Sequence, residues 1–211
     1  VSGTHSSGKG TFYHSRDHDF ISLATTGTHA KSIFVNGNDN EGSVVTIQLQ
    51  EEQRIMALAI SGQPGGDGSG LFIDFDSATI ADIARNEMDE QHGLQITESP
   101  DVVPPNVIGS VNLDLNTGTL TINADETIDA NPTSLVDLGR IYIENITGDN
   151  FVSLTGAKHV VASETKTLVV TLNEEQRVHA IEKSATPGGD ETALFLKVQN
   201  IALVDMAGLR M

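Results

Sequence analysis

Side chains that carry oxygen gather in two stretches of the chain where they could bind a divalent cation. Residues 36–41 combine asparagine, aspartate and glutamate, and a second set of carboxylates lies in and beyond residues 98–101. Calcium in proteins takes about six to eight oxygen ligands from carboxylates, amides and carbonyls. A polar hairpin tip in the first stretch, or a solvated linker in the second, would have the same composition. The calcium candidates are Asn36, Asn38, Asp39 and Glu41 in the first stretch, and Glu98 and Asp101 with Asp125 or Asp129 in the second.

A covalent modification is indicated at Asn145. It is followed by Ile146 and Thr147, and this triplet is the acceptor pattern for N-linked glycans. Such triplets also arise by chance. Asn145 is therefore a glycosylation candidate if the protein is secreted.

The sequence lacks the residue patterns that most often carry catalysis. It contains no cysteine, which excludes thiolate nucleophiles, thiolate metal sites and disulfides. It has no G-x-S-x-G or H-E-x-x-H pattern, and the glycine-rich PGGDGSG turn lacks the Lys-Ser/Thr ending of a phosphate-binding loop. We therefore expect no enzymatic activity and no cofactor other than calcium.

The charge balance excludes two classes of partner. The formal net charge is −17, from 29 acidic and 12 basic residues. Such a surface repels nucleic acid and anionic membranes, and it attracts cations. No apolar run is long enough to cross a bilayer. We expect neither nucleic-acid binding nor membrane insertion.

One stretch of the chain occurs twice. Residues 49–72 read LQEEQRIMALAISGQPGGDGSGLF, and residues 172–195 read LNEEQRVHAIEKSATPGGDETALF, a constant offset of 123. An earlier echo, Phe20–Leu23 against Phe151–Leu154, has an offset of 131. The first copy therefore carries eight extra residues, and its Asn- and Gly-rich segment 36–42 predicts a hairpin tip among them. A repeat of this size indicates one structural unit used twice.

Periodicity predicts short strands around a short helix in each copy. The helices are expected at Glu51–Ile60 and Glu174–Lys183, the second capped by Asn173 with Gln176 three residues on. Alternating apolar residues predict a hairpin from 107–115 and 119–122, and a last strand of the first copy at 94–97. Many short strands with regular turns are typical of an antiparallel β-sandwich.

The segment ESPDVVPP at 98–105 predicts a domain junction, because two prolines stiffen an extended link. The predicted domains are residues 1–100, which begin with a flexible arm at 1–11, and residues 101–211. The hairpin at 106–123 has no counterpart before the first copy, and the strand at 94–97 has none after the second. Two interpretations remain open: a segment of a longer tandem array, or a subunit whose neighbours supply the absent strands.

The motifs resemble those of a known family. Residues 101–143 have a D-x-x-PP junction, an ETID segment and a V-D-L-x-x-I strand, and LQEEQR and PGGDG resemble its "LTEAQR … SGTPGGDG" segment. Ala81–Asn86 resembles its D-x-AGN turn, with Arg85 where glycine is usual. The chain thus resembles immunoglobulin-like tandem repeats of large archaeal and bacterial surface-layer, adhesin or filament proteins. The resemblance implies an all-β fold of two immunoglobulin-like antiparallel β-sandwich repeats, each with a short helix in a crossover.

The resemblance also implies a role outside the cell. It favours a structural module of an extracellular surface layer, sheath or filament that assembles with itself and is braced by calcium. The alternative is an adhesive or ligand-binding module of a cell-surface adhesin. The sequence favours the first, since it has no tryptophan and two tyrosines to stack on sugars.

Overall fold

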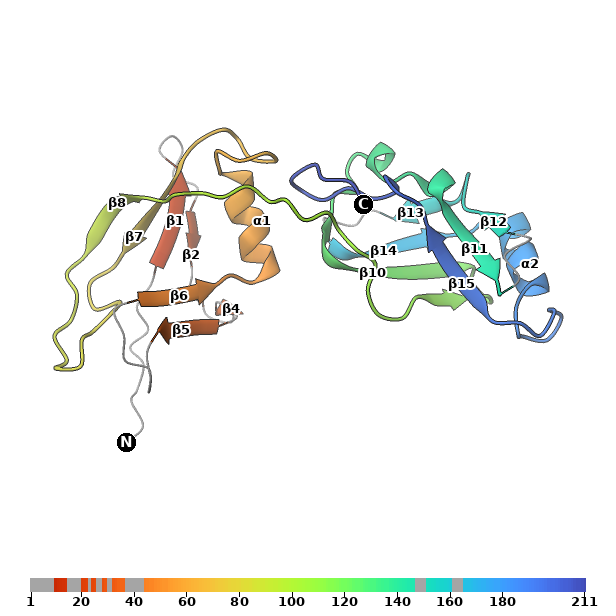
Figure 1. Ribbon diagram of the computed structural model, residues 1–211, viewed down its shortest axis with the longest axis horizontal. Helices are drawn as coiled ribbons and strands as arrows, with labels where there is room; N and C mark the ends of the chain where they lie inside the picture. Colours follow the sequence, from red (N-terminus) through yellow and green to blue (C-terminus); the bar gives the residue numbers. More distant parts are fainter. Residues whose placement is uncertain are drawn as a thin grey trace. The chain divides into compact units, whose positions relative to one another are not determined.

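The computed structural model describes residues 10–14, 20–22, 24–25, 28–29, 32–36, 44–146, 151–160 and 165–211. The chain divides into two compact units, Val1–Asp101 and Val102–Met211, and the predicted boundary lies one residue earlier (Figure 1). The fold is mostly β with antiparallel sheets, as the all-β prediction requires. Among the described residues, no helix is long and apolar enough to cross a membrane.

The first unit has a four-stranded sheet in the order β2-β1-β7-β8 and two separate strand pairs, β3-β4 and β5-β6. Gly10 and Thr11, which the sequence assigns to a flexible arm, belong to β1. The last strand begins at Gln91, three residues before its predicted start. The elements are β1 (Gly10–His14), β2 (Phe20–Ser22), β3 (Ala24–Thr25), β4 (Thr28–His29), β5 (Ser32–Asn36), β6 (Val44–Gln48), α1 (Glu51–Ala59), β7 (Leu71–Phe75) and β8 (Gln91–Gln95).

The second unit has two sheets, β13-β14-β10-β9 and β12-β11-β15. The predicted hairpin is confirmed, with Leu113 of β9 opposite Leu120 of β10. Its elements are β9 (Asn112–Asp114), β10 (Thr119–Ile128), the 3-10 helices η2 (Thr133–Leu135) and η3 (Leu138–Arg140), β11 (Ile141–Asn145), β12 (Phe151–Ser153), β13 (Lys158–Val160), β14 (Thr165–Thr171), α2 (Glu174–Glu182) and β15 (Leu194–Val198).

The core of the second unit joins both of its sheets. Along β10, buried and less buried residues alternate, which places Leu120 and Ile122 on the inner face. They belong to one buried cluster with Ile141 of β11, Val170 of β14 and Leu203 near the C-terminus. Each fully buried side chain of this size contributes about 1.5–3 kcal/mol to folding.

The helices begin where the sequence predicts and end one residue earlier. At α2, Asn173 Oδ1 accepts from Gln176 N (2.9 Å) and Gln176 Oε1 accepts from Asn173 N (3.0 Å), so the predicted capping box is confirmed. Gln176 Nε2 also donates to the carbonyls of Ser153 (2.7 Å) and Thr155 (2.9 Å). These bonds fix α2 to the end of β12.

Strand pairing in the two units follows the sequence offsets. Gly10 lies opposite Phe75 in β1 and β7, and Ile141 lies opposite Val198 in β11 and β15. One isolated bridge in each unit also corresponds, Ala81 with Glu87 and Val204 with Arg210. In these pairs, residues of the first strand correspond at the sequence offset of 131, and residues from β6 onward correspond at the offset of 123.

The eight extra residues of the first copy are divided between two places. Ser32 of β5 lies opposite Gln48, and Lys158 of β13 lies opposite Thr171, which gives an intermediate offset of 126. Five extra residues thus precede β5, where the β3-β4 pair lies, and three lie between β5 and β6. The β5-β6 hairpin is confirmed, with Asn36 opposite Val44.

Candidate functional site

The first calcium candidate cannot be placed in full. Asn36 is the last residue of β5. Asn38, Asp39 and Glu41 lie outside the described residues. Calcium binding in this hairpin stays a prediction.

Glu98 braces the glycine-rich turn of the first unit. Its Oε2 accepts from Gly62 N (3.0 Å), and its Oε1 accepts from Leu71 N (2.8 Å). Gly62 lies in the turn after α1, and Leu71 begins β7. Both oxygens therefore join backbone segments, an arrangement typical of a structural carboxylate.

Asp101 takes part in an ion pair. Its Oδ2 lies 3.0 Å from Arg54 Nη1, and the side chains are 19% and 33% exposed, respectively. The same guanidinium donates through Nε and Nη2 to both oxygens of Glu51, at 2.9 and 2.8 Å. Asp101 thus neutralises an arginine that also binds the first turn of α1.

The other two predicted ligands bond to nearby groups in the second unit. Asp125 Oδ1 accepts from Asn106 N (2.8 Å), and its Oδ2 accepts from Asn106 Nδ2 (3.2 Å). Asp129 Oδ1 accepts from Asn131 N (3.2 Å). Among the described residues, neither they nor Glu98 join a group of acidic side chains close enough to share an ion.

A different pair of carboxylates approaches closely inside the second unit. Oxygens of Glu126 and Asp205 lie within 4.8 Å of one another, and Asp205 is almost fully buried. Two negative charges so close repel unless a proton or a cation is shared. A cation could bind there, although two carboxylates supply a minority of the about six to eight oxygens that calcium takes.

The sequence contains a partial signal for Asp205. It corresponds to Asp82 at the offset of 123, and both close a turn in the same way. Asp205 Oδ1 accepts from Leu209 N (2.7 Å), and Asp82 Oδ1 accepts from Asn86 N (2.8 Å). Asp82 is exposed and its pKa is lowered by its bonds to Asn86. Burial distinguishes Asp205, and it depends on distant contacts that a local pattern does not encode.

Asn145 lies at the end of β11 and is 8% exposed. Its Nδ2 donates to Asp190 Oδ2 (2.9 Å), beside the PGGD turn that follows α2. Bonds from Thr192 to Asp190 hold the pKa of that carboxyl below its usual value. Glycosylation at Asn145 stays a prediction, and it requires that the glycan be attached before this strand packs.

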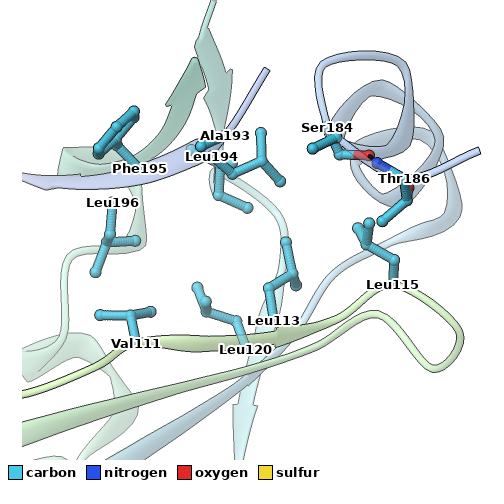
Figure 2. A pocket seen from close by; sticks show the side chains of 12 residues that line it. Val111, Leu113, Leu115, Leu120, Ser184, Thr186, Ala193, Leu194, Phe195 and Leu196 are labelled. Carbon is cyan, nitrogen blue, oxygen red and sulfur yellow. Dashed lines mark hydrogen bonds between the residues drawn. The ribbon is translucent and has the colours of Figure 1, made fainter. Parts of the chain in front are cut away.

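An apolar groove opens along β15. Leu194 and Leu196 point from β15 toward Leu113 and Leu120 of the other sheet, across a cavity of about 280 Å³ (Figure 2). In the part of the chain that the structure describes, β15 is the outermost strand of its sheet. None of the described residues that line the groove is ionisable. The groove offers backbone groups and apolar contact, the two features by which sheet edges bind extended segments.

Comparison with known proteins finds no match to any protein-family model, curated protein or solved structure.

Proposed function

We propose that this chain is a structural module of an extracellular assembly, such as a surface layer, sheath or filament. It consists of two immunoglobulin-like antiparallel β-sandwich repeats, each with a short helix in a crossover. The observation that carries the proposal is the correspondence of strand registers in the two units, including one isolated bridge in each. A repeated unit suits a role in which length and connection matter more than a reacting site.

The open edge of β15 supports assembly. An outermost strand presents unpaired N–H and C=O groups, and another chain can pair with them. The groove beside β15 adds apolar contact, and none of its described lining residues carries a carboxylate, imidazole or amino group. An open strand edge beside an apolar wall without carboxylate, imidazole or amino groups favours an interaction site over a catalytic one.

Calcium has a defined part in the proposal. With a net charge of −17, separate chains repel one another at low ionic strength. Divalent cations that bind the acidic surface reduce this repulsion and permit association. The carboxylates of the first hairpin, and the Glu126–Asp205 pair, are the places to look for them.

Sedimentation of the purified chain tests the proposal. We expect concentration-dependent association in millimolar calcium, with ordered assemblies visible by electron microscopy. A single monomeric species at high concentration in calcium would contradict the assembly role. Adding a chelator should lower the melting temperature or dissolve the assemblies. An unchanged melting curve would contradict the role of calcium without contradicting the assembly role.

A further inference from the structure

The corresponding strands β7 and β15 differ in what lies beside them. In the first unit β7 lies between β1 and β8. In the second, β15 pairs with β11 on one side, and no described strand lies on the other. The position that β8 occupies in the first unit is therefore the open side of the groove in the second.

The backbone of β15 is oriented to accept a strand on this side. Gln199 N donates to Arg140 O (2.9 Å), at the start of the ladder between β11 and β15. Hydrogen-bonded and non-bonded pairs alternate along an antiparallel ladder. Because Leu196 and Leu194 lie at non-bonded positions of this register, their N–H and C=O groups face away from β11.

The first unit shows how such groups are used. Leu71 and Ile73 correspond to Leu194 and Leu196 at the offset of 123. Ile96 N donates to Leu71 O (2.9 Å), and Ile73 lies opposite Leu94 of β8. The strand at β7 thus receives a partner through the same backbone positions that β15 leaves open.

A carboxylate completes the pairing in the first unit. Glu98 accepts from the N–H groups of Gly62 and Leu71. Their counterparts in the second unit are Ala185 and Leu194, and both line the groove. The groove therefore contains the two backbone donors that bind a carboxylate in the first unit.

The apolar wall of the groove fits the rest of such a strand. Leu94, Ile96 and Glu98 are two residues apart, so they lie on one face of an extended segment. Ile73 and Leu94 are directly opposite, and side chains of opposed residues lie on the same face. By correspondence, the equivalent apolar side chains would lie on the face of β15 from which Leu196 points into the groove (Figure 2).

We propose that the open edge of β15 and its groove bind an extended peptide segment from outside residues 102–211. The segment pairs antiparallel with β15 and carries the pattern apolar, polar, apolar, polar, acidic, as residues 94–98 (LQITE) do in the first unit. Its carboxylate accepts from the N–H groups of Ala185 and Leu194. This site rests on the proposed assembly role, for which it specifies how modules join.

A labelled peptide with the sequence of residues 89–100 (DEQHGLQITESP) tests the site on the full chain. We expect saturable binding by fluorescence polarisation, with NMR shifts in the amides of Leu194, Leu196 and Ala185. A peptide with glutamine in place of Glu98 should bind about tenfold more weakly, because it loses charge-assisted hydrogen bonds. Absence of binding at millimolar peptide would overturn the proposal.

Two groove variants and one control variant locate the binding. Leu113→Asp places a charge in the groove and should abolish binding, whereas Asn112→Asp on the exposed side of β9 should leave it unchanged. Leu196→Pro is a second test, because proline removes an N–H from the open edge and is tolerated on edge strands. The melting temperature of each variant checks that it folds. Binding that both groove variants leave intact would contradict the site.

The results separate this site from the proposed function. Peptide binding by a chain that stays monomeric in calcium would keep the site and refute self-assembly. If Leu113→Asp does not weaken assembly and the peptide does not bind, the assembly role stands and the site is refuted. Loss of assembly in Leu113→Asp would identify a second copy of the chain as a source of the strand.

Discussion

Arg54 and Arg177 occupy the same place in the two units, yet they end in different surroundings. Each donates through Nε and Nη2 to the glutamate three residues before it, at nearly equal distances. The remaining nitrogen, Nη1, donates to Asp101 in the first unit and to the carbonyl of Leu115 in the second. The local motif therefore fixes the arginine, and each unit supplies its own third acceptor.

The PGGD turns show the same division between local and distant contacts. In the first unit, Glu98 joins the turn to β7. In the second, Asp190 of the turn accepts from Asn145 in β11. In each unit, a carboxylate thus joins the segment around this turn to a strand of the same unit.

The largest expected effect tests whether the two turns are equally tight. An alanine methyl at Gly189 would collide with Ser184 O and lie 2.5 Å from Ile181 O, and one at Gly66 would collide with Ser61 O and lie 2.6 Å from Leu58 O. We expect Gly66→Ala and Gly189→Ala each to cost about 3 kcal/mol in the unfolding free energy of its own unit.

Hydrogen exchange of the amides in α1 and α2 measures this loss unit by unit. Gly70→Ala is a matched control, because its nearest neighbour, Gln95 Nε2, would lie 3.9 Å away. A loss of unfolding free energy in only one of the two variants would show that the two turns are not equally tight.

A smaller effect is expected where the copies differ in residue type. Arg85 and Gly208 correspond, and both have left-handed backbones, with φ of 67° and 85°. This conformation costs a residue with a Cβ about 1–2 kcal/mol. Arg85→Gly relieves this cost and should stabilise the first unit by up to about 1 kcal/mol. The gain is smaller than the full cost, because glycine has more conformational entropy in the unfolded chain. Gly208→Ala should destabilise the second unit by a similar amount, and urea unfolding of both variants checks the opposite signs.

The smallest effect is a difference in pH dependence. The bond to Asp74 raises the pKa of exposed His92, whereas burial lowers the pKa of His159, whose Nε2 has no hydrogen-bond partner among the described residues. As pH falls through the raised pKa toward 6.5, the usual value, protonated His92 adds stability to the first unit, and the gain is complete below 6.5. As pH falls below 6.5, His159 removes stability from the second unit, because the unfolded chain binds the proton first.

Calorimetry at pH 7.5 and 5 measures this difference. His159→Ile should reduce the loss of stability on acidification, and isoleucine is the residue at the corresponding position of the first copy, Ile33. His92→Gln should remove the gain in the first unit. Equal pH profiles for wild type and both variants would contradict the assignment.

Local features were predictable from the sequence, and long-range ones were not. The helix starts, the capping box at Asn173 and the hairpin between β9 and β10 depend on residues within a few positions of one another. The structural role of Glu98 depends on donors 27 and 36 residues away. Composition alone therefore placed it among metal ligands.

The same limit applies to the candidate site. The repeat placed β15 in correspondence with β7, and it left open what lies beside β15. The groove itself requires that Leu113 and Leu196, from different sheets, approach one another, and neither local periodicity nor charge encodes that approach. Its correspondence with Asp82 likewise identifies Asp205 as a turn residue, but the sequence does not predict that Asp205 is buried.

The brace formed by Glu98 has a consequence for how the chain folds during synthesis. The turn at Gly62 and the start of β7 leave the ribosome well before their shared acceptor does, because Glu98 lies 36 and 27 residues further along. Contacts between distant residues form late, since loop closure must come first. The first unit therefore completes this brace only when its last residues have left the ribosome.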